Sequence, residues 1–445
     1  MASIIKKQYY WGYLVILLSL LATMGIYFGS MWYYDGWYDY KLKYLAKIGS
    51  MSSTMLMCWA FLLATRFRVI EKLFGGLDKA YKAHRWVGES AFFLIFLHPI
   101  FLGLNPKHDF FSFFWVDYLP GEELHHYIAR MSGIAALFIF ILLVAFSLWI
   151  PMRYHRWKQT HNFFGLLLIL VVIHGVVARG EIMSYPFLFA WFGLWVSMGL
   201  LGFLYIRLLY RWFGPLHDYT LHHVEQLGDI TEIYLQPHRP YRKLLHRPGQ
   251  FVYIYFESPE LSAEPHPFSI SSEPQSDYLR ISIKELGDWT KKIHQLEKGD
   301  HAYVWGPYGK FSDHYFEHAD KQAVLIGGGI GITPFLSIVR DATFRSGDRN
   351  EVYLFYSYDK EGEDYYRDEV EQLDADIDHF HTILHCAEKK DYLSVDIIKE
   401  KVGGDLSNKI FLICGPKPMM DSLQEQLLDE GVSFEYIFKE DFSVI

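Results

Sequence analysis

The stretch HRWVGESAFFLIFLHP, residues 84–99, is apolar enough to lie in a lipid bilayer, yet it carries His84 and His98. A second apolar stretch, HNFFGLLLILVVIHG, begins at His161 and carries another histidine at His174. Ionisable groups inside a membrane are costly and usually mark a functional site. The two stretches therefore predict a membrane-spanning helical fold with titratable groups in its interior.

The composition supports a membrane half and a soluble half. The chain of 445 residues is 51% hydrophobic and 18% aromatic, which is rich for a soluble protein. Residues 1–211 hold 19 Lys and Arg against 10 Asp and Glu, a net charge of +9. Because the whole chain has a net charge of −9, residues 212–445 carry −18. We expect two or three domains, a basic membrane part followed by an acidic soluble part.

Apolar runs in the basic half are each close to the roughly 20 residues that span a bilayer. They lie near residues 9–29, 49–65, 86–104, 128–150, 162–178 and 185–206. The sequence therefore predicts six membrane-spanning helices.

The distribution of Lys and Arg between the helices predicts their orientation. With a cytosolic N-terminus, the cytosolic segments hold Lys6, Lys7, Arg66, Arg68, Lys72, Lys79, Lys82, Arg85, Arg153, Arg156, Lys158, Arg207 and Arg211. The opposite segments hold only Lys41, Lys43, Lys47, Lys107, Arg130 and Arg179. We therefore expect a plasma (inner) membrane protein with both termini and the soluble half in the cytosol. Three cysteines at unrelated spacings predict no disulfide framework, which suits that compartment.

The four membrane histidines are predicted to form two pairs. The third and fifth helices run parallel, so His84 and His161 share the cytosolic level, while His98 and His174 share an outer level about 20 Å away. Their spacings are near four helical turns, so both histidines of a helix point the same way. Each level is predicted to hold one haem, with an imidazole on either face of the iron. Hydrogen bonding to neighbouring helices is the alternative, and two matched pairs disfavour it.

A haem with histidines on both faces has no open iron position, so it carries electrons rather than oxygen atoms. Two such haems would form a ladder across the membrane, supplied with electrons from the cytosol. Phe92 lies near mid-helix between the two levels, where it would either separate the haems or, more commonly, face the lipid or pack in the core.

The soluble half reads as two domains. After a linker near residues 213–218, the β-type runs TEIYLQP, GQFVYIYF, YLRISIK and HAYVWG, separated by Gly and Pro, predict a small barrel. From residue 321 the strands KQAVLIGGG, EVYLFYSY, HTILHCA, KIFLICG and EYIFKEDF alternate with helices. That alternation predicts a parallel α/β sheet that binds a nucleotide at the carboxyl ends of its strands.

Motifs in this half carry a family resemblance. They are HPFSISS (266–272), IKELGDWT (283–290), WGPYGKF (305–311), IGGGIGITPF (326–335), CGP (414–416) and IFKEDF (437–442). Their order and spacing resemble the ferredoxin-reductase module of the NADPH oxidase and ferric reductase superfamily, and the paired histidines are similar too. The resemblance implies a transmembrane di-haem domain at 1–212, an FAD-binding antiparallel β-barrel at 213–318 and an NAD(P)H-binding α/β domain at 319–445.

The resemblance places FAD at HPFS and GDWT. Pro267 is expected to fix a turn, and Ser269 and the backbone to bind the isoalloxazine edge. Gly287 is expected to admit the pyrophosphate, which Thr290 and backbone N–H groups would bind. Either tetrapeptide alone is more often an ordinary turn. The expected FAD-binding residues are His266, Pro267, Phe268, Ser269, Lys284, Gly287, Asp288, Trp289 and Thr290.

The run GGGIGITP follows a strand and precedes a helix, which is the context that a phosphate-binding loop requires. Gly329 and Gly331 are expected to let the phosphates approach the helix. The resemblance implies that Cys414 lies beside the nicotinamide, and buried packing is the alternative for its thiol. The expected nucleotide-binding residues are Gly327, Gly328, Gly329, Gly331, Thr333, Pro334, Cys414, Gly415 and Pro416.

Phe442 matches the aromatic residue that stacks on the flavin in the family and yields to nicotinamide. Family members typically end at that residue, whereas residues 443–445 follow here, which puts the gating in doubt. After the second α/β strand, Asp359 would repel a 2′-phosphate and Lys360 would attract one. We expect NADPH on the resemblance, with NADH as the alternative.

The resemblance implies hydride transfer from NAD(P)H to FAD, then single electrons through both haems to the outer face. Oxygen, giving superoxide, is the expected acceptor. A ferric chelate is the alternative, as is a membrane partner docked at the loop DFFSFFWVDY. Arg130, with Arg179, His125 and His126, is expected near the acceptor, unless these residues serve haem propionates or the lipid surface. No nucleic acid and no obligatory protein partner are expected.

Overall fold

The structure is a computed structural model that describes residues 2–105, 110–115, 123–178, 181–262, 264–341, 344 and 350–441. The chain forms two compact units, Met1–Tyr210 and Arg211–Ile445.

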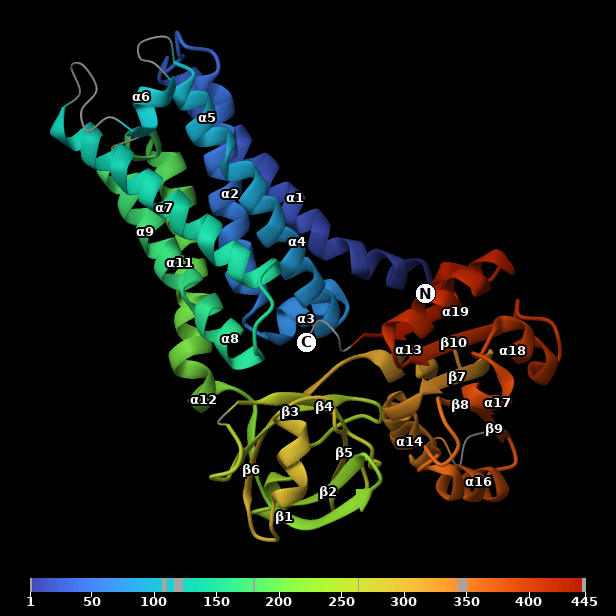
Figure 1. The fold of residues 1–445 in the computed structure, drawn as a ribbon. Coiled ribbons are helices and arrows are strands. Elements are labelled where there is room, and N and C mark those ends of the chain that lie inside the picture. The colour runs from blue at the N-terminus through green and yellow to red at the C-terminus, as the bar shows by residue number, and fades with distance from the viewer. Residues whose placement is uncertain are drawn as a thin grey trace. The chain divides into compact units, whose positions relative to one another are not determined.

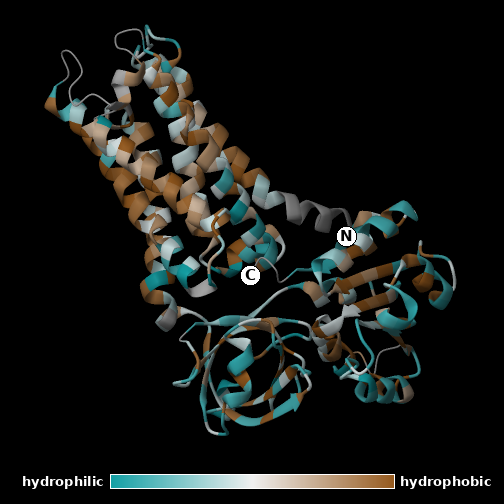
Figure 2. Cartoon of the chain, viewed as in Figure 1, coloured by the Kyte–Doolittle hydropathy of each residue, from teal (hydrophilic) through white to brown (hydrophobic). Residues whose placement is uncertain are grey.

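The first unit is an all-helical bundle in which apolar residues predominate (Figures 1 and 2). Among the described residues, six segments are long and apolar enough to cross a membrane: Trp11–Tyr33, Lys43–Leu63, Leu77–Gly103, Leu124–Leu148, Arg156–Val177 and Pro186–Leu209. The six predicted helices are therefore confirmed. The helices are α1 Ala2–Tyr33, α2 Lys43–Leu63, α3 Arg68–Phe74, α4 Leu77–Ile95, α5 Leu97–Gly103, α6 Phe110–Trp115, α7 Leu124–Leu148, α8 Tyr154–Asn162, α9 Phe164–Val177, α10 Glu181–Ser184, α11 Pro186–Leu204 and, after a π-helical turn, α12 Tyr210–Phe213.

The third and fifth spans are each built from two helices. The third breaks at Phe96, between α4 and α5. Pro99 explains this break, because it has no N–H to donate to the preceding turn and its ring crowds that turn. The fifth breaks at Phe163, between α8 and α9. Each break lies two residues from a predicted haem ligand, His98 and His161 respectively.

The second unit begins with a closed barrel. Its antiparallel sheet has the strand order β4-β3-β6-β1-β2-β5 within the described residues. A bridge between Ile270 and Ile281 joins the two ends of the sheet around an aliphatic core. The strands are β1 Leu216–Leu227, β2 Ile230–Pro237, β3 Phe251–Glu257, β4 His266–Ser269, β5 Leu279–Lys284 and β6 His301–Tyr308.

Two predicted details of this barrel are wrong. The linker predicted at 213–218 overlaps strand β1, whose polar residues, including His222 and His223, hide the strand in the sequence. HPFS, predicted as a turn, is strand β4, in which Pro267 pairs with Tyr253 of β3. The strand lies at the end of the sheet order, and an edge strand tolerates a proline that a central strand would exclude.

The remainder of the second unit is a parallel α/β fold. Its sheet has the order β11-β10-β7-β8-β9 in the described part of the chain, and apolar clusters cover both faces. The strands are β7 Gln322–Gly328, β8 Val352–Tyr358, β9 Phe380–Cys386, β10 Lys409–Cys414 and β11 Ile437–Glu440. The helices are α13 Phe311–Glu317, α14 Thr333–Arg340, α16 Arg367–Asp376, α17 Ala387–Lys390, α18 Val395–Val402 and α19 Lys417–Asp429. Each strand lies where the sequence predicted one.

Candidate haem and dinucleotide sites

The four membrane histidines form two facing pairs. The ring centres of His84 on α4 and His161 on α8 lie 5.9 Å apart, with their planes at 56°. Those of His98 on α5 and His174 on α9 lie 6.3 Å apart, with their planes at 79°. The pairs are the ones that the helical spacing predicts, whereas the role of these histidines as metal ligands stays a prediction.

A hydrogen bond at Nδ1 orients each of these imidazoles. In three of them the partner is a backbone carbonyl, so the proton is on Nδ1 and Nε2 is the nitrogen that would bind a metal. The separations are 2.8 Å from His84 to Ala60 O, 3.2 Å from His98 to Ala46 O, 2.9 Å from His174 to Ala129 O and 3.2 Å from His161 to Ser147 Oγ. The sequence holds no signal for these carbonyl partners, because every residue has a carbonyl.

Both pairs fit an iron atom between two imidazoles. Metal–nitrogen bonds of about 2 Å on either side place the ring centres roughly 6 Å apart, which is close to the observed 5.9 and 6.3 Å. Metal-bound histidines also commonly donate their other N–H to a carbonyl. The residues present therefore fit a haem at each level.

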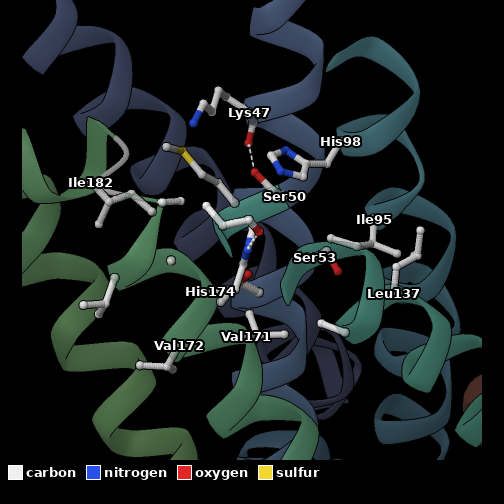
Figure 3. Close-up of a pocket in the computed structure, with 18 of the residues that line it drawn as sticks. Lys47, Ser50, Ser53, Ile95, His98, Leu137, Val171, Val172, His174 and Ile182 are labelled. Carbon is white, nitrogen blue, oxygen red and sulfur yellow. Dashed lines mark hydrogen bonds between the residues drawn. The ribbon is translucent and has the colours of Figure 1, made fainter. Parts of the chain in front are cut away.

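His98 and His174 line a cavity of about 490 Å³ (Figure 3). Its walls come mainly from α2, α5, α7, α9 and α11, and most of its lining is apolar. Its cationic side chains are Lys47 and Arg130, and Arg130 is 8% exposed. The predicted acceptor-side residue Arg130 therefore lies on this cavity, while Arg179 lies outside the described residues.

Gly133 on α7 makes room for the imidazole of His174. This role of Gly133 was not predicted from the sequence. A Cβ at Gly133 would lie 2.7 Å from Cε1 and 3.1 Å from Nδ1 of His174. The imidazole cannot easily withdraw, because Ala129 O holds its Nδ1. A glycine within an apolar helix was the available signal, since small residues allow close approach in membranes.

Gly133→Ala is expected to lower the haem content by up to one haem per chain, because the displaced imidazole loses its ligating position. The haem to flavin ratio of purified protein measures this loss. Gly25→Ala is the control, since a Cβ on Gly25 of α1 would meet nothing within 4 Å. An unchanged ratio in Gly133→Ala would show that the fit around His174 does not matter.

Aromatic side chains fill the bundle between the two levels. Phe92 is 5% exposed and makes edge contacts with Phe96 and Phe140, whose ring centres are 5.1 and 5.6 Å away. Phe140 contacts Phe164 at 6.1 Å, and Phe164 contacts His161 at 4.9 Å. Phe92 therefore packs in the core of the bundle.

The two predicted FAD motifs meet in the barrel. Trp289 of GDWT packs on His266 and Phe268 of β4, with ring centres 4.2 and 5.8 Å apart. In the described residues β4 pairs with β3, and the bridge that closes the barrel lies directly after it, at Ile270. A Cβ on Gly287 would meet nothing within 4 Å, which leaves space for a pyrophosphate. These features fit a flavin at HPFS and GDWT.

Thr290, which was predicted to bind the pyrophosphate, makes hydrogen bonds within its own turn. Its Oγ1 accepts hydrogen bonds from the backbone N–H groups of Leu286 and Gly287, both at 2.9 Å. Thr290 thus stabilises its own turn, and the N–H of Gly287 is engaged within that turn.

The glycines of GGGIGITP divide into two kinds. A Cβ on Gly331 would lie 2.3 Å from the carbonyl oxygen of Cys414, and one on Gly327 would lie 2.9 Å from Ile332 Cα. Gly331 therefore allows the loop to pack against β10, and its predicted contact with the dinucleotide stays a prediction. Gly329 has φ +53° and faces open space, so it is the glycine that fits approach of a phosphate to the start of α14.

Cys414 ends β10, beside Gly327 of β7 and Glu440 of β11. Its side chain is buried at 2% exposure. Burial, and then the carboxylates of Glu440 and Asp441, raise the pKa of the Cys414 thiol well above its ordinary value. The thiol is therefore protonated at neutral pH. Phe442, predicted to stack on the flavin, lies outside the described residues.

Two of the basic side chains that follow β8, those of Arg367 and Lys389, already pair with carboxylates. Arg367 is paired with Asp364 and Glu371 and donates to Tyr358 Oη. Lys389 pairs with Glu361 at 2.5 Å. The choice between NADPH and NADH, expected to depend on Asp359 and Lys360, stays a prediction.

Three family models match the chain. They are the ferric reductase like transmembrane component at residues 48–172, the FAD-binding domain at 224–332 and the oxidoreductase NAD-binding domain at 325–425. The chain is 27% identical to dual oxidase 2 of Rattus norvegicus over 297 residues, which is 60% of this chain and 19% of that protein. It is 30% identical to NADPH oxidase 1 of Mus musculus over 126 residues, 26% of this chain and 21% of that protein. The matches thus span about a fifth of each relative.

A solved flavohemoglobin from Malassezia yamatoensis, with bound FAD and heme, resembles the chain with a TM-score of 0.50. It is 18% identical, and the match covers 90% of this chain and 96% of that chain. At this identity the likeness concerns the fold alone.

The chain thus combines six helices that are long and apolar enough to cross a membrane with regions similar to the ferric reductase like transmembrane component, the FAD-binding domain and the oxidoreductase NAD-binding domain. In this combination the chain is similar to NADPH oxidases and ferric reductases.

Proposed function

We propose that the chain is a transmembrane NADPH oxidase that oxidises NAD(P)H on one side of the membrane and reduces oxygen to superoxide on the other. The balanced reaction converts one NADPH and two O₂ into NADP⁺, H⁺ and two superoxide ions. One observation carries this proposal. Two pairs of histidines face each other, with ring centres 5.9 and 6.3 Å apart, in a chain that also matches FAD- and NAD-binding domains.

When bound, FAD exchanges electron pairs for single electrons, and haems with histidines on both faces carry single electrons across the lipid. His84 and His161 would hold one haem, and His98 and His174 the other. Carbonyl oxygens keep three of these imidazoles in the tautomer that presents Nε2. The buried aromatic rings around Phe92 keep water out of the region between the two levels.

The residues at the carboxyl ends of the α/β strands would bind and orient NAD(P)H. Gly329 and the start of α14 would receive the phosphates. Cys414 would lie beside the nicotinamide, where its protonated thiol adds bulk and a weak donor without adding charge. Trp289 and β4 would hold the flavin in the neighbouring barrel.

The orientation is part of the proposal. The excess of Lys and Arg on one side favours a cytosolic reductase unit in a plasma (inner) membrane. His84 and His161 lie on helices α4 and α8 near the end of the bundle from which α11 leads into the second unit. Electrons would therefore enter at this pair and leave at His98 and His174.

The haem held by His98 and His174 would lie in the cavity that these residues line, so a small acceptor is favoured beside it. The lining of the cavity is mainly apolar, which suits oxygen. Lys47 and Arg130 on the same cavity favour the second candidate, an anionic ferric chelate. The other alternative, an electron-donating subunit, would use the loop DFFSFFWVDY, of which residues 110–115 are described and form α6.

Purified protein supplied with FAD and NADPH should reduce cytochrome c, and superoxide dismutase should abolish that reduction. Turnover with a ferric chelate that is insensitive to the dismutase would favour the ferric reductase. Turnover that appears only with a membrane partner would favour the electron-donating subunit.

Cys414→Ala is expected to slow flavin reduction by NADPH about tenfold or more, because loss of a group beside the nicotinamide loosens the geometry for hydride transfer. Stopped-flow absorbance of the flavin measures the rate. Cys386→Ala is a matched control, since Cys386 is also buried and ends the edge strand β9. Equal slowing in both variants would indicate a general packing defect instead.

A further inference from the structure

Glu123, His125 and His126 form a compact cluster at the start of α7. One ligand atom from each residue can be chosen so that all three lie within 4.8 Å of one another. Glu123 Oε2 is 3.1 Å from His125 Nδ1, and the two imidazole centres are 4.0 Å apart. Neighbouring residues of a helix do not normally face each other, so this convergence is a local feature of the helix start.

The ligand types suit a first-row transition metal. Two imidazoles and one carboxylate are ligands for Zn²⁺, Fe²⁺ or Cu²⁺ rather than for Mg²⁺ or Ca²⁺, and three protein ligands leave coordination positions open. Bonds of about 2.0–2.2 Å place neighbouring ligand atoms roughly 3–3.5 Å apart. The Glu123–His125 separation already has this value, and His126, which is exposed, can move to complete the set.

The cluster adjoins the cavity that contains the second histidine pair. His126 lines that cavity together with His98, His174 and Arg130. Glu123 and His125 are not part of its lining. An ion held by all three side chains would therefore lie at the rim of the cavity, beside the site proposed for the second haem.

We propose that Glu123, His125 and His126 bind a divalent transition-metal ion at the rim of this cavity, and that the bound ion restricts access of the acceptor. Metal binding itself does not depend on the proposed oxidase activity. The effect on turnover rests on that activity, because it requires an acceptor that enters the cavity.

Zn²⁺ is a suitable probe because it has no redox chemistry. Isothermal titration of the purified full chain with Zn²⁺ should show one site, whose affinity falls at least tenfold in Glu123→Gln and in His125→Ala. The control is the double variant His222→Ala/His223→Ala. That pair is also preceded by Leu and followed within three residues by Glu225, but it lies on strand β1, where His222 stacks on Tyr278 and His223 contacts Tyr234.

The same variants test the effect on access. Zn²⁺ should inhibit superoxide formation by the natural chain and by the β1 control, but not by Glu123→Gln, whose activity without zinc should be unchanged. Wild-type affinity in both cluster variants, or equal loss in the control, would overturn the metal site. Zinc bound at the cluster without inhibition would overturn the restriction of access. A chain that binds zinc but makes no superoxide would contradict the proposed function and leave the metal site standing.

Discussion

His174→Ala is expected to lower the haem content from two to one per FAD and to reduce superoxide formation at least a hundredfold. His174 faces His98 at 6.3 Å, its Nδ1 is held by Ala129 O, and Gly133 provides the space for its ring. Alanine leaves His98 without an opposing ligand, whereas the pair His84 and His161 is untouched. Flavin reduction by NADPH should therefore proceed at its normal rate.

Absorption spectra with haem and flavin quantified measure the first effect, and stopped-flow absorbance measures flavin reduction. His125→Ala is the control, because it removes an imidazole near the same end of the bundle that is not on the cavity. A His174→Ala protein that keeps both haems would show that this imidazole is not a ligand.

Arg280→Ala is expected to destabilise the reductase unit by about 3–5 kcal/mol, because it leaves a buried carboxylate without its ion-pair partner. Arg280 on β5 is 5% exposed and Glu232 on β2 is 1% exposed. The guanidinium donates to both oxygens of Glu232, at 2.6 and 2.8 Å. It also donates to Glu369 of α16 at 3.0 Å, so it joins the barrel to the α/β fold.

Thermal unfolding of the purified protein, followed by the fluorescence of released FAD, measures this loss. Arg340→Ala is the control. Arg340 of α14 also pairs with Glu369, at 2.7 Å, but it is 26% exposed on its side chain. Its removal is expected to cost only about 1 kcal/mol or less. Equal effects of the two variants would mean that burial of the Arg280 pair is unimportant.

The pH dependence of the destabilisation caused by Arg280→Ala gives an independent check. Burial raises the pKa of Glu232, but the hydrogen bonds and charge of Arg280 outweigh burial, so the net pKa lies below the ordinary value. In the natural protein the ionised Glu232 carboxylate stabilises the fold at pH values above its pKa in the unfolded chain, which is about 4.3. This stabilisation is lost as the pH falls through the lower pKa that Glu232 has in the folded protein. Without Arg280, only the hydrogen bonds from Ser282 and Tyr234 oppose burial, so the pKa of Glu232 rises and acid relieves the defect. The difference between variant and natural protein should therefore shrink from pH 7 to pH 4.

The sequence predicted the parts of the fold that strong periodic patterns specify. Apolar length identified the six spans, and helical spacing identified which histidines face each other. The strands of the α/β fold were found because buried parallel strands are continuous apolar runs. Strand β1 was missed because residues such as His222 and Glu225 interrupt its alternation.

The predicted site was less complete because several of its determinants are contacts between distant segments. HPFS reads as a turn until β3 pairs with it, and only the packed structure shows that Trp289 rests on His266. Gly331 was assigned to the phosphates, and its packing against the carbonyl of Cys414 was not predicted. The carbonyl groups that orient the histidines have no sequence signature at all.

The most direct test of the account is the stoichiometry of haem and flavin in the purified full chain, produced with ample haem and FAD. Four imidazoles in two facing pairs predict a Soret band, two b-type haems and one FAD per chain. A protein that carries FAD but shows no Soret absorption, or that binds a single haem lost in neither His84→Ala nor His174→Ala, would contradict that account.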